Sequence, residues 1–127
     1  RLEARGKMLT LSHKKLDIWK FSLDLLLNIY KLIKVFPKEE TFGLISQLRR
    51  ASVSVTSNIA EGLSRTSSLE KIRFLEIARS SLVEIDTQIE IAIALGYCKE
   101  SELLEIDKLS NSLFAMISSL IKKIKSK

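Results

Sequence analysis

Apolar residues recur at helical spacing over residues 16–36. Intervals of three and four residues are typical of the buried seam of a helix in a bundle. Pro37 closes this segment, because the residue before a proline is pushed out of the helical region, and Pro37 itself suits the first turn of a following helix. The stripe predicted to face the core comprises Leu16, Trp19, Leu23, Leu26, Tyr30 and Ile33, widened by Leu25, Ile29, Leu32 and Phe36.

The second predicted helix runs from Pro37 to Gly62. Glu39 and Glu40 fall in its first turn, where the helix dipole favours carboxylates, and Gly43 loosens its start. Gly62 is interpreted as its C-terminal cap, since glycine readily takes a positive φ. Its predicted core stripe comprises Ile45, Leu48, Ser52, Val55, Ile59 and Gly62.

Two more helices follow. Ser67 and Glu70 match a capping box, which predicts a third helix that begins there and ends at Gly96. The fourth begins near Ser101 and ends in lysines, which suit a helix C-terminus. The predicted stripes comprise Leu75, Ala78, Leu82, Ile85, Ile89 and Ala92 in the third helix, and Leu103, Ile106, Ser110, Leu113, Ile117, Leu120 and Ile124 in the fourth.

Short connections between four helices favour antiparallel neighbours, so we predict an all-α, up-down-up-down four-helix bundle. No segment alternates as a strand would. We expect one bundle domain over residues 14–127, preceded by a disordered N-terminal segment over residues 1–13.

Composition narrows the class of protein. The formal net charge is +6. We interpret Met8 as a start residue and residues 1–7 as a vector-derived tail, whose net charge of +2 leaves +4. No apolar run is long enough to span a membrane, and a single cysteine excludes a disulfide framework within the chain. We therefore expect a cytoplasmic protein with no membrane contact.

The residues needed for enzymatic chemistry are scarce. His13 is the only histidine and precedes the first helix, so no Glu-x-x-His pair exists for a di-iron centre. Cys98 has no histidine partner nearby in sequence, and an inert thiol is the simpler interpretation. We expect a protein that is not an enzyme and binds no cofactor.

The stretch 47–62 carries more small hydroxyl residues than a surface helix needs. Such residues favour close approach of another chain and local hydrogen bonds. In an antiparallel pair, Arg50 lies within one turn of Glu84, which predicts an ion pair that sets helix register or a subunit contact. The candidate contact residues are Gln47, Arg50, Ser54, Ser57, Asn58, Glu61 and Glu84.

Basic residues concentrate in the second and third helices. With the lysines at the C-terminus they form candidate patches for phosphates, although charged helix faces are commonly just solvated. Aromatic residues do not interleave with them in sequence, so base stacking is not predicted. The candidate nucleic-acid-binding residues are Arg49, Arg50, Arg65, Lys71, Arg73 and Arg79.

Two blocks of the second helix resemble a known family. Gln47-Leu48-Arg49-Arg50-Ala51 and Ser57-Asn58-Ile59-Ala60-Glu61-Gly62 are similar to those of the S23 proteins, small four-helix bundles encoded in intervening sequences of bacterial 23S ribosomal RNA genes. In the third helix, Ser80 stands where members of the family usually have a glycine, just before Ser81 and Leu82. Further matching segments are Leu16-Asp17-Ile18-Trp19, Phe36-Pro37, Ala78-Arg79-Ser80-Ser81-Leu82-Val83-Glu84 and Leu95-Gly96-Tyr97.

The resemblance implies a homopentamer of antiparallel bundles. It also implies a relation to the accessory protein of diversity-generating retroelements, which is associated with nucleic acid and a reverse transcriptase. The family's biochemical role is unsettled, and its ribosomal name does not make the protein a ribosomal subunit.

Two hypotheses follow. In the first, the protein is a non-enzymatic oligomer that binds RNA or DNA through basic patches. In the second, it is an assembly or scaffold protein that binds another protein, and its arginines are structural.

Overall fold

The computed structural model describes Leu9 and residues 16–127. Four long helices occupy most of that range: α1 (Asp17–Leu32), α2 (Leu44–Ser64), α3 (Ser68–Ala94) and α4 (Leu104–Lys125). Three single turns of 3-10 helix lie in the connections, namely η2 (Ile33–Val35), η3 (Lys38–Glu40) and η4 (Glu100–Glu102). No strand occurs in the described residues. The segment 1–13 that was predicted to be disordered, which includes His13, lies outside the described residues except for Leu9.

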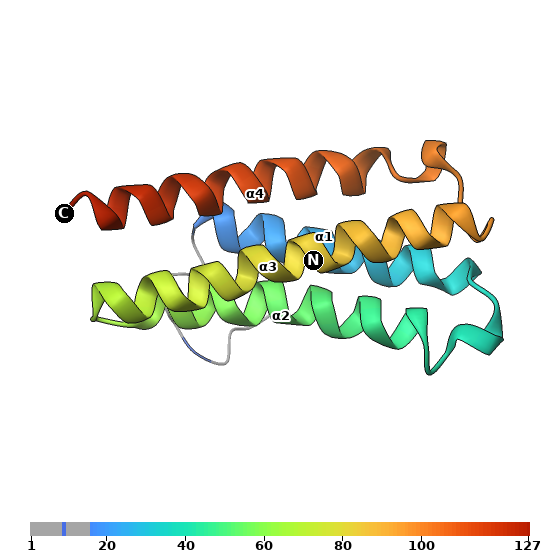
Figure 1. Ribbon diagram of the computed structural model, residues 1–127, viewed down its shortest axis with the longest axis horizontal. Helices are drawn as coiled ribbons and strands as arrows, with labels where there is room; N and C mark the ends of the chain where they lie inside the picture. Colours follow the sequence, from blue (N-terminus) through green and yellow to red (C-terminus); the bar gives the residue numbers. More distant parts are fainter. Residues whose placement is uncertain (1–8, 10–15) are drawn as a thin grey trace.

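The helices form an antiparallel bundle in which each packs against the next (Figure 1). α4 also packs against α1, so the helices close into a square around one apolar core. The predicted up-down-up-down four-helix bundle is therefore confirmed. None of the described helices is both long and apolar enough to cross a membrane.

The predicted core stripes of α2 and α3 are confirmed, since every residue of both is buried. In α4 the stripe is buried at Leu103, Ile106, Leu113 and Ile117. Its last turns differ slightly, because Ile121 is buried there and Leu120 is only half-buried.

The predicted core stripe of α1 is confirmed only in part. The residues predicted to widen it, Leu25, Ile29, Leu32 and Phe36, are buried, whereas most of its main line lies about one residue off the core. Leu16 is exposed, and the residues predicted to follow it toward the core are mostly half-buried on the flank. Apolar residues cover so much of α1 that periodicity alone fits two neighbouring stripes. The stripe that faces the core comprises Ile18, Ser22, Leu25, Ile29 and Leu32.

Gly62 does not cap α2, which continues to Ser64. It is buried inside the helix, where an added Cβ would lie 3.2 Å from the Leu75 Cγ and 3.2 Å from the Lys71 carbonyl oxygen. Gly62 thus permits close packing of α2 on α3. The predicted end of α3 is confirmed, because Gly96 follows the helix with a φ of 80°.

The predicted start of α2 is also wrong, because the helix begins at Leu44 rather than near Pro37. The intervening residues form η3 and a turn. Glu40 still serves the helix N-terminus from this turn, since its carboxylate accepts hydrogen bonds from the Leu44 backbone N–H (2.9 Å) and the Tyr97 hydroxyl (2.8 Å). These bonds, the backbone one first, lower the pKa of the Glu40 carboxyl.

The predicted start of α3 is confirmed. The Ser67 hydroxyl accepts a hydrogen bond from the Glu70 backbone N–H at 3.3 Å, as the capping motif requires. α2 and α3 are therefore joined by a very short connection.

Candidate interaction surfaces

Polar residues line the groove between α2 and α3 on its outer side. The hydroxyls of Ser54 and Ser81 share a hydrogen bond of 2.8 Å across the two helices. Asn58 donates to the Ser54 carbonyl (2.8 Å) and hydroxyl (3.0 Å). Ser54 and Asn58 therefore join the helices of one bundle, whereas the Ser57 side chain is exposed.

A polar hollow of about 200 Å³ opens farther along this groove. Gln88 is only 8% exposed at its base; its amide nitrogen lies 3.5 Å from the Gln47 Oε1, and its own Oε1 is buried without a partner. Arg50 and Glu84 line the same hollow but form no ion pair. Both are exposed and keep their hydration, so pairing gains little. The antiparallel register was predicted correctly, but the ion pair was not.

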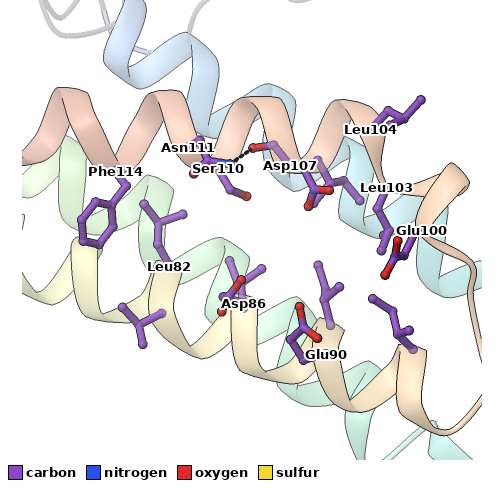
Figure 2. A pocket seen from close by; sticks show the side chains of 15 residues that line it. Leu82, Asp86, Glu90, Glu100, Leu103, Leu104, Asp107, Ser110, Asn111 and Phe114 are labelled. Carbon is purple, nitrogen blue, oxygen red and sulfur yellow. Dashed lines mark hydrogen bonds between the residues drawn. The ribbon is translucent and has the colours of Figure 1, made fainter.

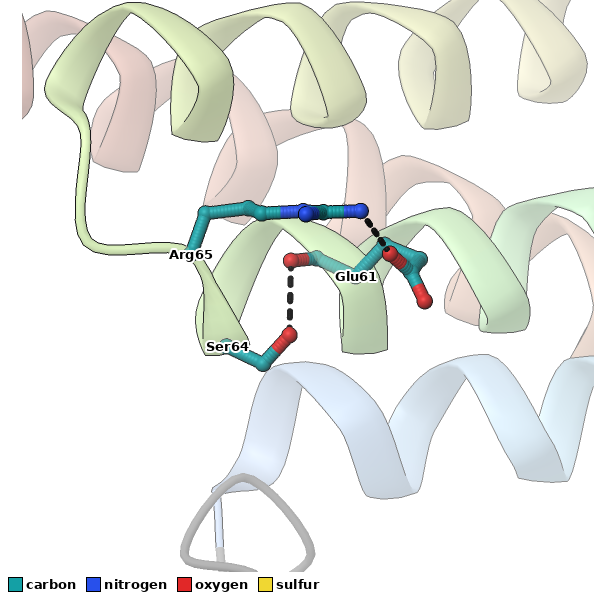
Figure 3. Close-up of polar contacts among 3 residues, drawn as sticks. All are labelled: Glu61, Ser64 and Arg65. Atoms are coloured by element: carbon teal, nitrogen blue, oxygen red, sulfur yellow. Dashed lines mark hydrogen bonds and ion pairs between the residues drawn. The ribbon is translucent and has the colours of Figure 1, made fainter.

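Glu61 is paired within its own helix. Its carboxylate accepts from Arg65 at 2.7 Å, one turn along at the end of α2 (Figure 3). The Arg65 guanidinium also lies over the Phe74 ring, 4.9 Å from its centroid. These contacts hold Arg65 against the turn between α2 and α3.

Two further basic candidates contact neighbouring elements. Arg79 donates to the Ser118 hydroxyl at 3.1 Å and lies 5.9 Å from the centroid of the Phe114 ring, which ties α3 to α4. Lys71 donates to the Leu63 carbonyl at 3.5 Å. Arg79 thus points into the side between α3 and α4, away from the other candidates.

Three of the candidates lie where the chain turns from α2 into α3. Figure 1 shows that this turn and the C-terminal end of α4 are at the same end of the bundle. Leu63 and Lys123 line one hollow there, which brings the end of α2 next to the last turns of α4. We call this region the basic end; its cations are Arg65, Lys71, Arg73, Lys122, Lys123, Lys125 and Lys127.

Arg49 and Arg50 lie toward the other end of α2, beside aromatic residues that their sequence neighbourhood does not reveal. The Arg49 guanidinium is 5.7 Å from the centroid of the Tyr30 ring on α1. Arg50 has no hydrogen-bond or ion-pair partner within residues 16–127. Both arginines line a hollow of about 410 Å³ together with Tyr30, Phe42 and Val53. The arginines therefore have aromatic neighbours in space that the absence of interleaved aromatic residues in sequence does not reveal.

A groove between α3 and α4 has the opposite charge (Figure 2). Its volume is about 410 Å³ and apolar side chains from both helices form its floor. Asp86 and Glu90 border it on α3, and Glu100 and Asp107 border it on the α4 side. None of these carboxylates has an ion-pair partner within residues 16–127. We call this the acidic groove; it repels a polyanion.

The described residues hold no cluster of side chains suited to a metal ion. Cys98 is buried, and burial, followed by the nearby Glu102 charge, raises the pKa of its thiol. A thiol in that state is a poor nucleophile at neutral pH.

Residues 14–119 match the family of 23S rRNA-intervening sequence proteins. The chain belongs to this family. A similar solved structure is the crystal structure of a protein of unknown function from the S23 ribosomal protein family of Bacteroides thetaiotaomicron. It is 25% identical, the likeness covers 83% of this chain and 95% of that one, and the TM-score is 0.75. No curated protein matches this chain. The predicted family and fold are confirmed, while the family's own function is unknown.

Proposed function

We propose that this protein is a non-enzymatic, oligomeric helical bundle that associates with nucleic acid through its basic end. The observation that carries the proposal is the meeting of two chain segments there, the α2–α3 turn and the last turn of α4. Arg73 and the four lysines are exposed, so their charges are available to phosphates.

The positions of the charged residues support nucleic-acid binding at the basic end more strongly than the net charge does. Residues 16–127 carry 16 Lys and Arg against 14 Asp and Glu, a net charge of only +2. Seven of those cations lie at the basic end, whereas the acidic groove holds four carboxylates. An oligomer repeats this polarity, and a pentamer of the kind that the family resemblance implies would give a stronger field than one copy.

Binding of a fluorescently labelled structured RNA and a DNA duplex, measured by anisotropy at several salt concentrations, tests the proposal. We expect the logarithm of the affinity to fall linearly with the logarithm of salt, because each neutralised phosphate releases counterions. No binding near physiological salt, or binding indifferent to salt, would refute it.

Charge reversal locates the site. Replacing Arg73, Lys122 and Lys123 with Glu should abolish binding, and the matched control replaces three exposed lysines far from the basic end, Lys31→Glu, Lys34→Glu and Lys99→Glu. Both variants change the net charge equally. Equal loss in both would mean that only total charge matters, and the basic end would not be the site.

A second function, assembly with another protein, is favoured by one observation. Apolar side chains are exposed on the outer face of α2 and α3, beside the polar hollow; they are Val53, Ile77, Ile91 and Leu95. Replacing Arg49 and Arg50 with Glu separates the two functions. Loss of the oligomer with unchanged nucleic-acid binding in the remaining species would favour the assembly function.

A further inference from the structure

Phe42 is the most exposed large apolar residue of the described chain, with 95% of its surface accessible to solvent. A loose loop does not account for this. The Thr41 hydroxyl donates to the Lys38 carbonyl at 2.7 Å, and the Gly43 backbone N–H donates to the Glu40 carbonyl at 3.0 Å. The residues on both sides of Phe42 are thus fixed by hydrogen bonds, and the ring is held out from the bundle.

The hollow beside Phe42 combines aromatic rings with positive charge. Tyr30 and Phe42 line it together with Arg49 and Arg50, and no carboxylate does. Arg50 is exposed, and no hydrogen bond or ion pair within residues 16–127 occupies its guanidinium. A ligand that fits has a flat apolar face and negative charge nearby.

We propose that this hollow binds single-stranded nucleic acid, with an unpaired base stacked on Phe42 and the adjoining phosphates held by Arg49 and Arg50. The inference rests on the proposed association with nucleic acid but concerns a different site. A duplex keeps its base faces stacked inside, whereas every unpaired base offers a face to an aromatic ring. Arginine guanidinium groups bind phosphate through several donors at once.

The site is far enough from the basic end to be tested by itself. Phe42 precedes α2, which is 21 residues long, and the basic end begins where α2 stops. At a rise of 1.5 Å per residue, the two sites are about 30 Å apart. The basic end supplies charge without exposed aromatic rings of this kind, so the two sites should differ in their preference for single strands.

The experiment measures anisotropy of a labelled 12-nucleotide single-stranded RNA and of the same sequence as a duplex, with the full chain. Phe42→Ala should weaken single-strand binding about 5- to 160-fold, the range found for loss of one stacked base, and leave duplex binding unchanged. Phe42→Trp should retain the affinity. The matched control is Leu104→Ala, since Leu104 is also an exposed apolar residue (73%) and lies beside the acidic groove.

Arg50→Gln tests the phosphate contact. It should weaken single-strand binding and reduce the slope of log affinity against log salt by about 1. Phe42→Ala should leave the slope of log affinity against log salt unchanged, because it removes no charge. Comparing the two variants therefore separates the contribution of base stacking from that of the phosphate contact.

Each contrary result has a definite meaning. If Phe42→Ala binds single strands as tightly as the unaltered protein, the inference is wrong while salt-dependent duplex binding still supports the basic end. If Phe42→Ala instead reduces the oligomer's mass by light scattering without changing RNA affinity, the ring is a protein contact and the inference is again wrong. If the unaltered protein binds neither strand form, both proposals fail.

Discussion

Gly62 offers a direct test of how closely α2 packs on α3. In an unconstrained helix interior, alanine in place of glycine stabilises the fold by roughly 0.5–1 kcal/mol. Here the new Cβ would lie 3.2 Å from both the Leu75 Cγ and the Lys71 carbonyl oxygen, closer than the optimum of about 3.5–4.0 Å between carbon atoms. Leu75 is fully buried and the Lys71 carbonyl belongs to the α3 backbone, so neither moves easily.

Overpacking of this kind costs about 1–3 kcal/mol, which exceeds the gain in helix propensity. We expect Gly62→Ala to lower the free energy of unfolding by about 1 kcal/mol, and Gly62→Val by more than about 2 kcal/mol because it places further atoms in the contact. Urea denaturation followed by far-ultraviolet circular dichroism, at one protein concentration, measures both. Ser57→Ala on the exposed side of α2 is the control and should be neutral or slightly stabilising. A Gly62→Ala variant more stable than the original by about 1 kcal/mol would refute the close packing.

Three other predictions concern polar and reactive groups. Gln88→Met should raise the free energy of unfolding by about 1 kcal/mol, because it removes a buried carbonyl without a partner, and a lower urea midpoint would contradict this. The hydrogen bonds to the Glu40 carboxylate lower its pKa. Their contribution to the free energy of unfolding is therefore complete above the ordinary glutamate pKa of about 4.3 and disappears as pH falls through the lowered value. The free energy of unfolding should therefore fall less between pH 5 and pH 3 in Tyr97→Phe than in the original chain. An equal fall in both would exclude the Tyr97 hydrogen bond as a contributor. Cys98 should react with a thiol reagent at pH 8 far more slowly in the native protein than in urea, and rapid native labelling would show that its burial is transient.

The stripes of α2 and α3 were predictable because one regular set of residues at intervals of three and four is buried in each, although Val53 and Ile77 stay exposed outside those stripes. The stripe of α1 was less predictable, because Leu23 and Leu26 compete with Leu25 for the core, and only packing against α2 and α4 decides between them. Gly62 was misread because a glycine near a helix end suits a cap as well as a close contact, and the neighbour that decides, Leu75, lies on another helix.

The candidate sites show the same limit. The antiparallel register brought Arg50 and Glu84 to one hollow as predicted, but exposed charges are not obliged to pair. Tyr30 and Phe42 were not associated with the arginines because they come from another helix and a connection, which no local pattern links to α2. The hollow could not be predicted from Phe42 either, because nothing in sequence distinguishes an exposed phenylalanine from a buried one.

The even number of antiparallel helices has a practical consequence. α1 begins and α4 finishes at the same end of the bundle, and Asp17, Leu63 and Lys123 line one hollow there (Figure 1). A tag or fused domain joined directly after α4 is therefore tethered beside the C-terminal lysines and competes for the space around them. Immobilisation through such a tag would present the opposite end of the bundle, with Phe42, to the solution, so surface-based assays would report the two nucleic-acid sites unequally.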